Sequence, residues 1–292
     1  MASLKDVRGR IASVSSTKKI TSAMKMVSAA KLRRAQDVIT NYLPYQQKLT
    51  ETLDNFLANE SDEIQLPLAD ERPIKKLAII AISSNGSLCG AFNSNVMKKT
   101  EEVILQYDTL AKDDIIFYTI GKKVSEYIAK KGYTIKERHD NLVEKADYEG
   151  TVAIINQVIQ LFLKKEIDCV EIVYNHFKNA AVQQITHEII LPLTKNISRI
   201  KESNSTVDYI IEPNRAHLIK ELVPTVLRLR LYSAILDSIA AEYGARTTAM
   251  QTATDNAEDL IFDLKLKYNK ARQEAITKEI IDIVGGAEAL RS

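Results

Sequence analysis

The segment TVLRLRLYSAILDSIAAEYGARTTAMQTATDNAEDLIFDLKLKYNKARQEAITKEIIDIV, residues 225–284, decides the fold because it lacks the residues that end helices. Its sixty residues include no proline and a single glycine, Gly244. Helices average about 11–12 residues, and sixty residues of continuous helix would extend about 90 Å. That exceeds the diameter of a compact domain of this mass, so we expect the helix to protrude or to lie along another element.

Uncharged side chains recur along this segment at alternating spacings of four and three residues. They are Leu222, Val226, Leu229, Ser233, Leu236, Ala240, Tyr243, Thr247, Met250, Thr254, Ala257, Ile261, Leu264, Tyr268, Ala271 and Ala275. This spacing is typical of a coiled coil. The middle of the stripe has small or weakly polar side chains, which allow helices to approach closely but form a poor hydrophobic seam.

The N-terminal segment is predicted to be the second long helix. Neither glycine nor proline occurs between Gly9 and Pro44. The expected apolar positions are Leu4, Val7, Ile11 and Val14, then, after a gap, Ile20, Ala23, Val27 and Ala30, with Tyr42, Tyr45, Leu49 and Phe56 further on. Pro44 is expected to kink this helix or to mark a joint. Long helices at opposite ends of a chain can pair antiparallel.

The middle of the chain has a different pattern. Residues 77–82, 114–120 and 169–174 have the composition of buried strands, and helical stretches are expected at 95–107, 122–131 and 151–165. Residues 184–191 are a candidate edge strand. Strands that alternate with helices indicate an α/β domain with a mainly parallel sheet.

The predicted fold class is therefore α/β. A long antiparallel coiled coil of the N- and C-terminal helices carries a Rossmann-like α/β domain inserted between them. The expected domain boundaries are 1–58 for the first helix, 59–73 for a linker, 74–212 for the α/β domain and 213–292 for the last helix.

The loop after the first expected strand is a candidate nucleotide site. Residues 83–90, SSNGSLCG, have two glycines without the spacing of a dinucleotide fingerprint or a phosphate loop. A tight turn that opens a helix is the favoured interpretation, and cofactor binding the minor one. Cys89 as a nucleophile is disfavoured against a small buried thiol, because the four histidines show no catalytic or metal-binding spacing.

Composition excludes several classes of protein. With 45% hydrophobic and 27% charged residues, the chain is ordinary for a globular protein rather than a disordered one. No apolar run approaches the roughly 18 residues of a membrane helix, and the first residues do not resemble a signal peptide. Two cysteines cannot form a disulfide framework. We expect a soluble intracellular protein.

Charge is unevenly distributed on a chain whose formal net charge is only +2. The first 34 residues contain one acid, Asp6, and nine basic residues: Lys5, Arg8, Arg10, Lys18, Lys19, Lys25, Lys31, Arg33 and Arg34. A basic helix can be a solvated face, a nucleic-acid or membrane contact, or a site for an acidic protein. The local bias favours a partner.

Several segments resemble one protein family over essentially the whole chain. At the N-terminus these are RGRIASV (8–14), TKKIT (17–21) and AMKMV (23–27), and in the middle LCGAFN (88–93). The most specific are ATDNA (253–257), YNKARQ (268–273), ITKEI (276–280) and IVGGA (283–287). The chain resembles the gamma subunit of bacterial F-type ATP synthase. Residues 85–87, Asn-Gly-Ser, depart from the family's usual Asp-Arg/Lys-Gly.

The resemblance implies a non-catalytic rotor shaft for a proton-translocating enzyme complex. Three alpha and three beta subunits would surround the coiled coil, and the epsilon subunit and c-ring would lie at its base. It implies no cofactor, metal or nucleic acid, and a peripheral position on the cytoplasmic face of the bacterial plasma membrane. The implied partner contacts are Lys18, Lys19, Met24, Lys25, Lys31, Arg33, Arg34, Arg272, Gln273 and Thr277, with an epsilon-side turn at Leu88, Cys89 and Gly90.

Two other functions are kept as alternatives. One is a structural coiled-coil scaffold with an unrelated α/β cap. The other is a nucleic-acid-binding protein that uses the basic N-terminus, for which DNA binding by the isolated chain would fall steeply with salt. No aromatic residue occurs in the first 34 residues, which disfavours a surface for stacking single-stranded bases.

Overall fold

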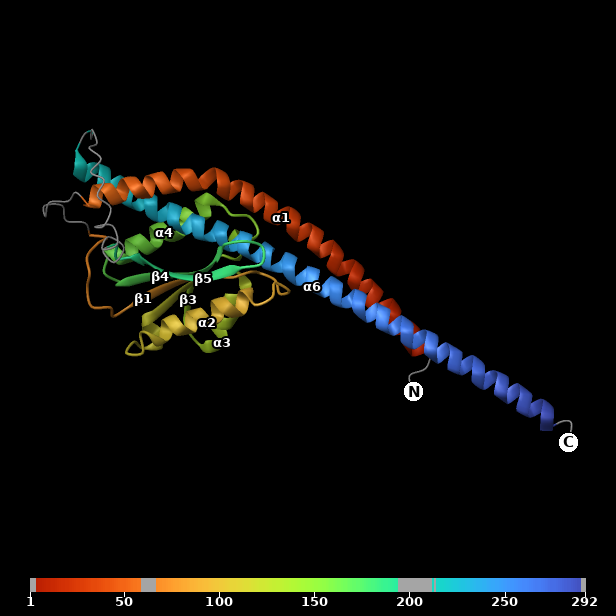
Figure 1. Cartoon of the computed structure of the whole chain (residues 1–292). Helices are drawn as coiled ribbons and strands as arrows, with labels where there is room; N and C mark the ends of the chain where they lie inside the picture. The colour runs from red at the N-terminus through yellow and green to blue at the C-terminus, as the bar shows by residue number, and fades with distance from the viewer. Residues whose placement is uncertain (1–3, 59–66, 194–211, 213, 290–292) are drawn as a thin grey trace. The chain divides into compact units, whose positions relative to one another are not determined.

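A computed structural model describes residues 4–58, 67–193, 212 and 214–289 of the chain. Contacts divide it into two compact units (Figure 1). The first unit combines residues 1–28 with residues 247–292, and the second comprises residues 29–246. Both terminal segments therefore contribute to each unit, and the units are described in turn.

Two long helices, α1 and α6, form the ends of the chain. Helix α1 spans Leu4–Ala58 and α6 spans Arg215–Ala289. Pro44 lies inside α1 and Pro224 inside α6. Pro44 therefore does not mark a joint between two helices, because the helix continues on both sides of it.

In the first unit, α1 and α6 pair antiparallel. The hydroxyls of Thr21 and Thr254 are 2.8 Å apart, and Lys18 Nζ lies 2.8 Å from a carboxylate oxygen of Glu258. Every position of the α6 stripe from Met250 to Ala271 is buried or half-buried. The four-three spacing thus identified the contact face of α6 correctly.

The stripe predicted for α1 is correct at its start and wrong in its middle. Further on it is correct at Tyr42, Leu49 and Phe56, which are buried or half-buried, and wrong at Tyr45, which is 58% exposed. Leu4, Val7, Ile11 and Val14 face the partner helix, but Ile20, Ala23, Val27 and Ala30 are exposed. Because the helix continues without a break, the spacing set by its first turns places Lys18, Thr21, Lys25 and Ser28 on the seam instead. The seam is polar there, so apolar residues were a misleading guide to it.

The α/β part of the second unit is built on one five-stranded sheet. Its strands are β1 Leu77–Ile82, β2 Ile115–Ile120, β3 Thr134–Arg138, β4 Cys169–Phe177 and β5 Gln183–Leu191. The spatial order is β3-β2-β1-β4-β5, with only β5 antiparallel to its neighbour. The predicted Rossmann-like sheet with an edge strand is confirmed.

Strand β3 was not predicted. Its sequence Thr-Ile-Lys-Glu-Arg has one apolar side chain, and its burial alternates between exposed and half-buried. An edge strand with so little apolar surface lacks the periodic signal by which strands are recognised. The nearby short helices η1 Lys112–Asp114 and η2 Asp140–Val143 have a similarly weak signal.

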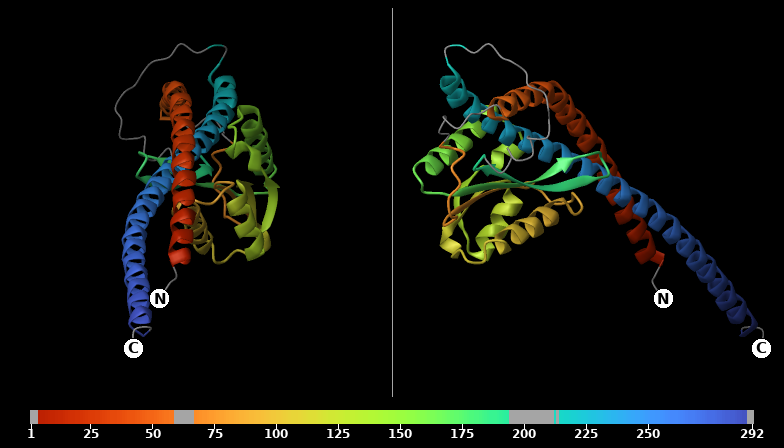
Figure 2. Two further views of the ribbon diagram at one scale, coloured as in Figure 1. Left: turned by 90° about the vertical axis from the view of Figure 1, so that its right-hand side faces the viewer. Right: turned by 60° about the vertical axis from the view of Figure 1, so that its left-hand side comes forward.

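Helices cover both faces of the sheet. They are α2 Phe92–Leu105, α3 Lys122–Lys131 and α4 Tyr148–Leu163, each within a few residues of the predicted range. The face with Leu77, Ile79 and Ala81 packs against α2 and α3. The opposite face packs against α4 and the parts of α1 and α6 within this unit (Figures 1 and 2).

Aromatic contacts join α1, α4 and α6, the helices that cover this opposite face of the sheet. The rings of Tyr42 and Tyr232 meet edge to face at 5.1 Å, and those of Tyr148 and Tyr232 at 5.4 Å. The Tyr42 hydroxyl also donates to the carbonyl of Leu229 at 3.2 Å. Such contacts contribute beyond the burial of apolar area. They fix α1, α4 and α6 to one another on this face of the sheet.

A buried ion pair fastens the segment before β1 to the start of β4. Asp168 accepts hydrogen bonds from the backbone N–H groups of Lys75 and Lys76, at 2.9 and 3.0 Å, and pairs with Arg72. Arg72 also donates to the Phe162 carbonyl at 3.0 Å. The predicted linker, 59–73, lies outside the described residues as far as residue 66, and its end is held in place by these bonds.

We expect Asp168→Asn to destabilise the chain by about 2–4 kcal/mol at pH 7, since it breaks a buried charged network. Burial alone would raise the pKa of Asp168, but the bonds from Lys75, Lys76 and Arg72 together lower it. A lowered folded-state pKa stabilises the fold above the unfolded pKa, about 3.9, and that contribution disappears as pH falls through the folded pKa.

Urea unfolding of wild type and Asp168→Asn at several pH values measures the contribution of the Asp168 charge to the free energy of unfolding. The difference in unfolding free energy should be largest near neutral pH and should shrink below about pH 4. Glu166→Gln, an exposed acid two residues away, is the control and should change little. An equal loss of stability at all pH values would contradict the role of the Asp168 charge.

Candidate partner-binding surfaces

The basic residues predicted on the first part of α1 differ in what their side chains contact. Lys18 is on the seam and is paired with Glu258, whereas Lys19 is exposed. Met24 and Lys25 are half-buried at the edge of the seam. A surface ion pair such as Lys18–Glu258 contributes little to stability, about 0–1 kcal/mol. Lys19 is the member of this group most accessible to another protein.

Further along α1, in the second unit, the other three predicted residues also differ. Lys31 Nζ lies 5.3 Å from the ring centroid of Tyr243, in cation–π geometry. Arg33 and Arg34 are exposed. Arg34 and Lys31 line a cavity of about 330 Å³, which Tyr243 also lines. Charge therefore remains available at Arg33 and Arg34, while Lys31 already has a partner in the chain.

Apolar side chains are exposed beside the basic residues of α1. Ile20, Met26 and Val27 each have 58–65% of their surface exposed. Large apolar side chains that gather on a surface mark interaction sites more often than scattered single ones do. Sequence reasoning missed this surface because it assigned Ile20 and Val27 to the helix seam.

The end of α6 has no packing partner among the residues that the structure describes. All described side chains from residue 272 to 287 are exposed, including those of Arg272, Gln273 and Thr277. The stripe position Ala275 is among them, contrary to prediction. The exposed apolar residues of this end are Ile276, Ile280, Ile281, Ile283 and Val284.

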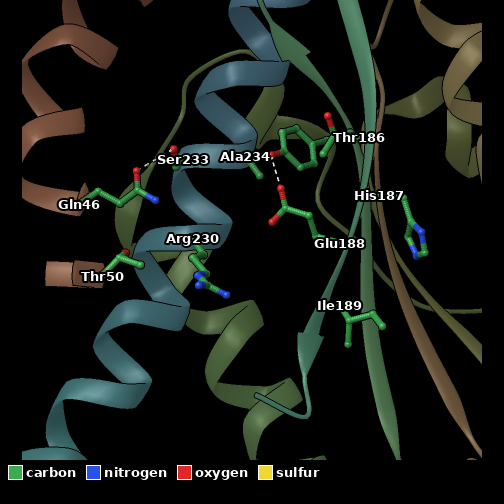
Figure 3. A pocket seen from close by; sticks show the side chains of 10 residues that line it. Gln46, Thr50, Thr186, His187, Glu188, Ile189, Arg230, Ser233 and Ala234 are labelled. Carbon is green, nitrogen blue, oxygen red and sulfur yellow. Dashed lines mark hydrogen bonds between the residues drawn. The ribbon is translucent and has the colours of Figure 1, made fainter. Parts of the chain in front are cut away.

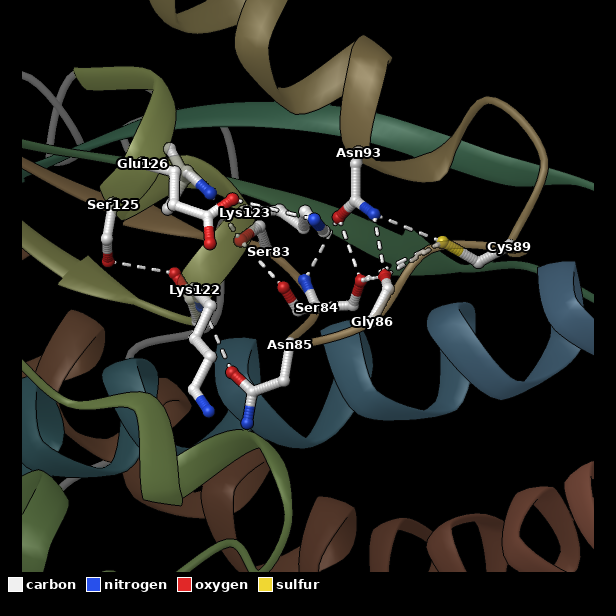
Figure 4. Close-up of polar contacts among 12 residues, drawn as sticks. Ser83, Ser84, Asn85, Gly86, Cys89, Asn93, Lys122, Lys123, Ser125 and Glu126 are labelled. Carbon is white, nitrogen blue, oxygen red and sulfur yellow. Dashed lines mark hydrogen bonds and ion pairs between the residues drawn. The ribbon is translucent and has the colours of Figure 1, made fainter. Parts of the chain in front are cut away.

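The turn between β1 and α2 has a defined structure (Figure 4). Leu88 and Gly90 adopt positive φ angles of 66° and 58°. Asn93, in the first turn of α2, accepts from the Ser84 backbone N–H at 3.1 Å and donates to the Gly86 carbonyl at 3.1 Å. These bonds close the loop on itself, as expected of a tight turn that opens a helix.

The side chains of the predicted turn residues point to different environments. Leu88 is 58% exposed, while Cys89 is buried with Phe92, Ala241 and Ala245. Burial raises the pKa of the Cys89 thiol, against a smaller lowering by the Ser84 hydroxyl. A buried thiol with a raised pKa is a poor nucleophile. Cys89 is therefore a packing residue, and Leu88 is the side chain that this turn offers to a partner.

Arg246 holds the same turn against α6 within the second unit. Its guanidinium pairs with Glu242, which is 5% exposed, and donates to the Ser87 carbonyl at 3.3 Å. Burial raises the pKa of Glu242, and Arg246 opposes this effect. The pairing satisfies a charge that would otherwise be buried alone, and it fixes where the turn lies on the helix.

Among the described helices, none has an apolar stretch long enough to cross a bilayer. The exposed surfaces described above are short, mixed apolar and basic patches on long helices. Their chemistry suits protein partners, which can bury the apolar side chains and supply acidic groups to the cations.

Comparison with known proteins identifies the family. The family model described as ATP synthase matches residues 3–290. A protein from Bacteroides fragilis named ATP synthase gamma chain is 48% identical over 291 residues, covering 99% of this chain and 100% of that protein. The chain belongs to the ATP synthase gamma chain family. A gamma chain from Christiangramia forsetii is also 48% identical, with 99% of each chain covered.

Solved structures share the fold. One chain of the Euglena gracilis mitochondrial ATP synthase, in an OSCP/F1/c-ring assembly in rotational state 3, aligns with a TM-score of 0.68 at 20% identity. The alignment covers 98% of this chain and 94% of that chain. A chain of the Tetrahymena thermophila mitochondrial ATP synthase central stalk and c-ring aligns with a TM-score of 0.58 at 23% identity. This alignment covers 80% of this chain and 99% of that chain.

Family membership decides the class of function. A gamma chain is a subunit of the F1 sector of a proton-transporting ATP synthase, where it is the rotor shaft of the central stalk and is not itself catalytic. An unrelated coiled-coil scaffold and a nucleic-acid-binding protein are not favoured. The basic N-terminus and the exposed end of α6 are therefore to be interpreted as surfaces of a rotor.

Proposed function

We propose that the paired helices α1 and α6 turn inside a ring of three alpha and three beta subunits, driven by proton flow through a membrane c-ring. The observation that carries this proposal is the end of α6, residues 272–287, where every described side chain is exposed and five are large and aliphatic. An isolated helix with such a surface is unfavourable in water. A surrounding sleeve of protein would bury it.

The shaft can act on the beta subunits because its two helices differ chemically. The exposed face of α1 mixes the cations Lys19, Arg33 and Arg34 with the apolar side chains of Ile20, Met26 and Val27, whereas the exposed end of α6 carries five large aliphatic side chains. A beta subunit facing the mixed surface of α1 experiences a different interaction free energy from one facing α6. A conformational equilibrium shifts only by the difference in binding between its states. Rotation would therefore change the state of each beta subunit in turn.

Arg272, Gln273 and Thr277 are proposed to contact beta-subunit loops, with Lys18, Lys19, Met24, Lys25, Lys31, Arg33 and Arg34 forming the second contact group. Lys18 and Lys31 already have partners in the chain. Lys19, Arg33 and Arg34 are therefore the cations expected to contact the beta subunits most strongly.

The base of the rotor is proposed to be the α/β domain. Its partners would be the epsilon subunit, at the turn formed by Leu88, Cys89 and Gly90, and the c-ring. The boundaries at residues 58, 73 and 212 remain predictions. In a bacterial cell this arrangement would place the chain on the cytoplasmic face of the plasma membrane, held there by its partners.

Co-purification tests the proposed assembly. A tagged chain isolated from native membranes in mild detergent should bring alpha and beta subunits in equal amounts, three of each per chain. The same tag on a chain truncated after Ala271 keeps the paired part of α6 and removes the exposed end. Unchanged recovery of alpha and beta with the truncated chain would contradict burial of that end in the ring.

A further inference from the structure

The second unit contains a polar cavity of about 670 Å³ bounded by two helices and the sheet edge (Figure 3). Its walls come from α1, α6, β4 and β5. The lining residues are Gln46, Thr50, Tyr174, Thr186, His187, Glu188, Ile189, Arg230, Ser233 and Ala234. Small-molecule sites typically have volumes of about 300–1,000 Å³. The cavity therefore has the size of a site for a small ligand, and none of its residues belongs to the predicted partner contacts.

Arg230 supplies a positive charge without a matching anion. Its half-buried side chain extends from α6 into the cavity (Figure 3). Within the described part of the chain, no residue forms an ion pair or hydrogen bond with its guanidinium. Guanidinium groups stay charged at all relevant pH values and offer a planar fork of donors. That fork matches the oxygens of a phosphate or carboxylate.

Thr50 adds an unsatisfied group to the same wall. Its hydroxyl oxygen is buried and has no hydrogen-bond partner among the described residues. Nearby, the Ser233 hydroxyl donates only a weak hydrogen bond to the Gln46 amide oxygen, because their separation of 3.5 Å is long for such a bond. Leaving a buried hydroxyl unpaired is unfavourable. A ligand oxyanion beside Arg230 would accept from its guanidinium, and rotation of the Thr50 side chain would bring its hydroxyl to the same oxyanion.

Glu188 places a negative charge on the facing wall. It lies on β5, and one of its carboxylate oxygens accepts from the Tyr174 hydroxyl at 2.9 Å. Burial raises the pKa of Tyr174, and the neighbouring charge of Glu188 raises it further. The Tyr174 hydroxyl therefore stays protonated and donates. Glu188 and Arg230 do not pair with each other in the described structure. The other oxygen of Glu188 can therefore accept from a cationic group of a ligand.

We propose that this cavity binds a small soluble zwitterion with a phosphate at one end and an ammonium group at the other. The phosphate would contact Arg230, Thr50 and Gln46, because a tetrahedral oxyanion offers more acceptor oxygens to three donors than a carboxylate does. The ammonium would contact Glu188. Few apolar residues line the cavity, Ile189 and Ala234 among them, which favours a free molecule over the same headgroup on a lipid.

Phosphoethanolamine is the probe, with inorganic phosphate and ethanolamine as its two halves. Calorimetry on the full chain should show phosphoethanolamine binding at least about tenfold tighter than either half, since only the whole molecule makes both charged contacts at once. Ligand bound across α1, α6 and β5 should also raise the melting temperature. Vesicles containing phosphatidylethanolamine should not bind the chain, and binding to these vesicles alone would contradict a soluble ligand.

Three variants separate the contacts. Arg230→Gln and Arg230→Lys should each weaken phosphoethanolamine and phosphate binding, the former at least about tenfold. Glu188→Gln should weaken phosphoethanolamine but leave phosphate binding unchanged or stronger. Arg228→Gln is the control, because Arg228 pairs with Asn156 outside the cavity, at 3.0 Å.

Circular dichroism and melting curves show which variants are folded. No binding of any probe at millimolar concentration by folded wild type would overturn the proposal. Undiminished phosphoethanolamine binding by folded Arg230→Gln and Arg230→Lys would also overturn it. None of these measurements depends on the chain acting as a rotor, so their failure is distinct from failure of the proposed function.

Discussion

Replacing Arg272 and Gln273 together with alanine is expected to slow steady-state ATP hydrolysis by the assembled complex several-fold, while assembly remains normal. Both side chains are exposed and lie between the stripe positions Ala271 and Ala275, off the helix seam. Arginine offers a fork of donors, and glutamine both donates and accepts, which suits bonds made and broken as a shaft turns. Each such bond to a charged group contributes roughly 1–3 kcal/mol.

The effect should be kinetic rather than structural. Because the two side chains are exposed and pack against none of the described residues, their loss should leave the helix folded and should raise a barrier at particular rotor positions. Purified complexes of verified subunit composition are compared, with Lys278→Ala/Glu279→Ala, two exposed residues of the same helix, as the control. Wild-type turnover by the Arg272→Ala/Gln273→Ala complex would reject the proposed beta contact.

Reversing the charge of Lys19, Arg33 and Arg34 together should impair coupling more than assembly. These three cations of the predicted set are exposed and carry no ion pair to another described residue. Changing them to glutamate replaces attraction to an acidic partner with repulsion, and desolvation at an interface strengthens that difference. Lys18 and Lys31 are left unchanged because their intramolecular contacts would complicate the result.

The matched control reverses Lys5, Arg8 and Arg10, which are equally exposed on α1 and alter net charge by the same amount. Proton pumping per ATP hydrolysed is measured in membrane vesicles. The Lys19, Arg33 and Arg34 variant should pump far less per ATP than the control variant. Equal coupling in the two variants would show that the position of these cations is unimportant.

Long-range regularity was predictable from the sequence, and local exceptions were not. The four-three stripe located the buried face of α6 as far as Ala271, and apolar runs located β1, β2 and β4. On α1 the same reasoning failed at Ile20 and Val27, because a seam sheltered by its own pairing accepts Thr21 and Ser28 while apolar side chains face outward. The hydrophobic pattern alone could not distinguish a seam position from an exposed apolar one.

The candidate sites also contain features that the sequence pattern predicts and features that only the folded chain reveals. Exposure of Arg272 and Gln273 was predicted from their offset from the stripe, but the structure exposes every described side chain from residue 272 to 287, Ala275 included, because this end of α6 lacks a partner among the described residues. That Lys18 would pair with Glu258, or Arg246 with the carbonyl of Ser87, depends on residues far apart in the sequence. The cavity at Arg230 is formed by four separate segments. Its residues carry no motif, so only the folded chain brings them together.

Rotation of the chain within the complex tests the shaft role most directly. A fluorescent bead can be attached through Lys98→Cys on α2, an exposed position, since both native thiols, Cys89 and Cys169, are buried. With alpha and beta subunits fixed to a surface, the bead should turn in one direction in three equal steps per revolution when ATP is supplied, and should stop when ATP is exhausted. Sustained ATP hydrolysis by complexes whose bead does not turn would contradict the shaft role.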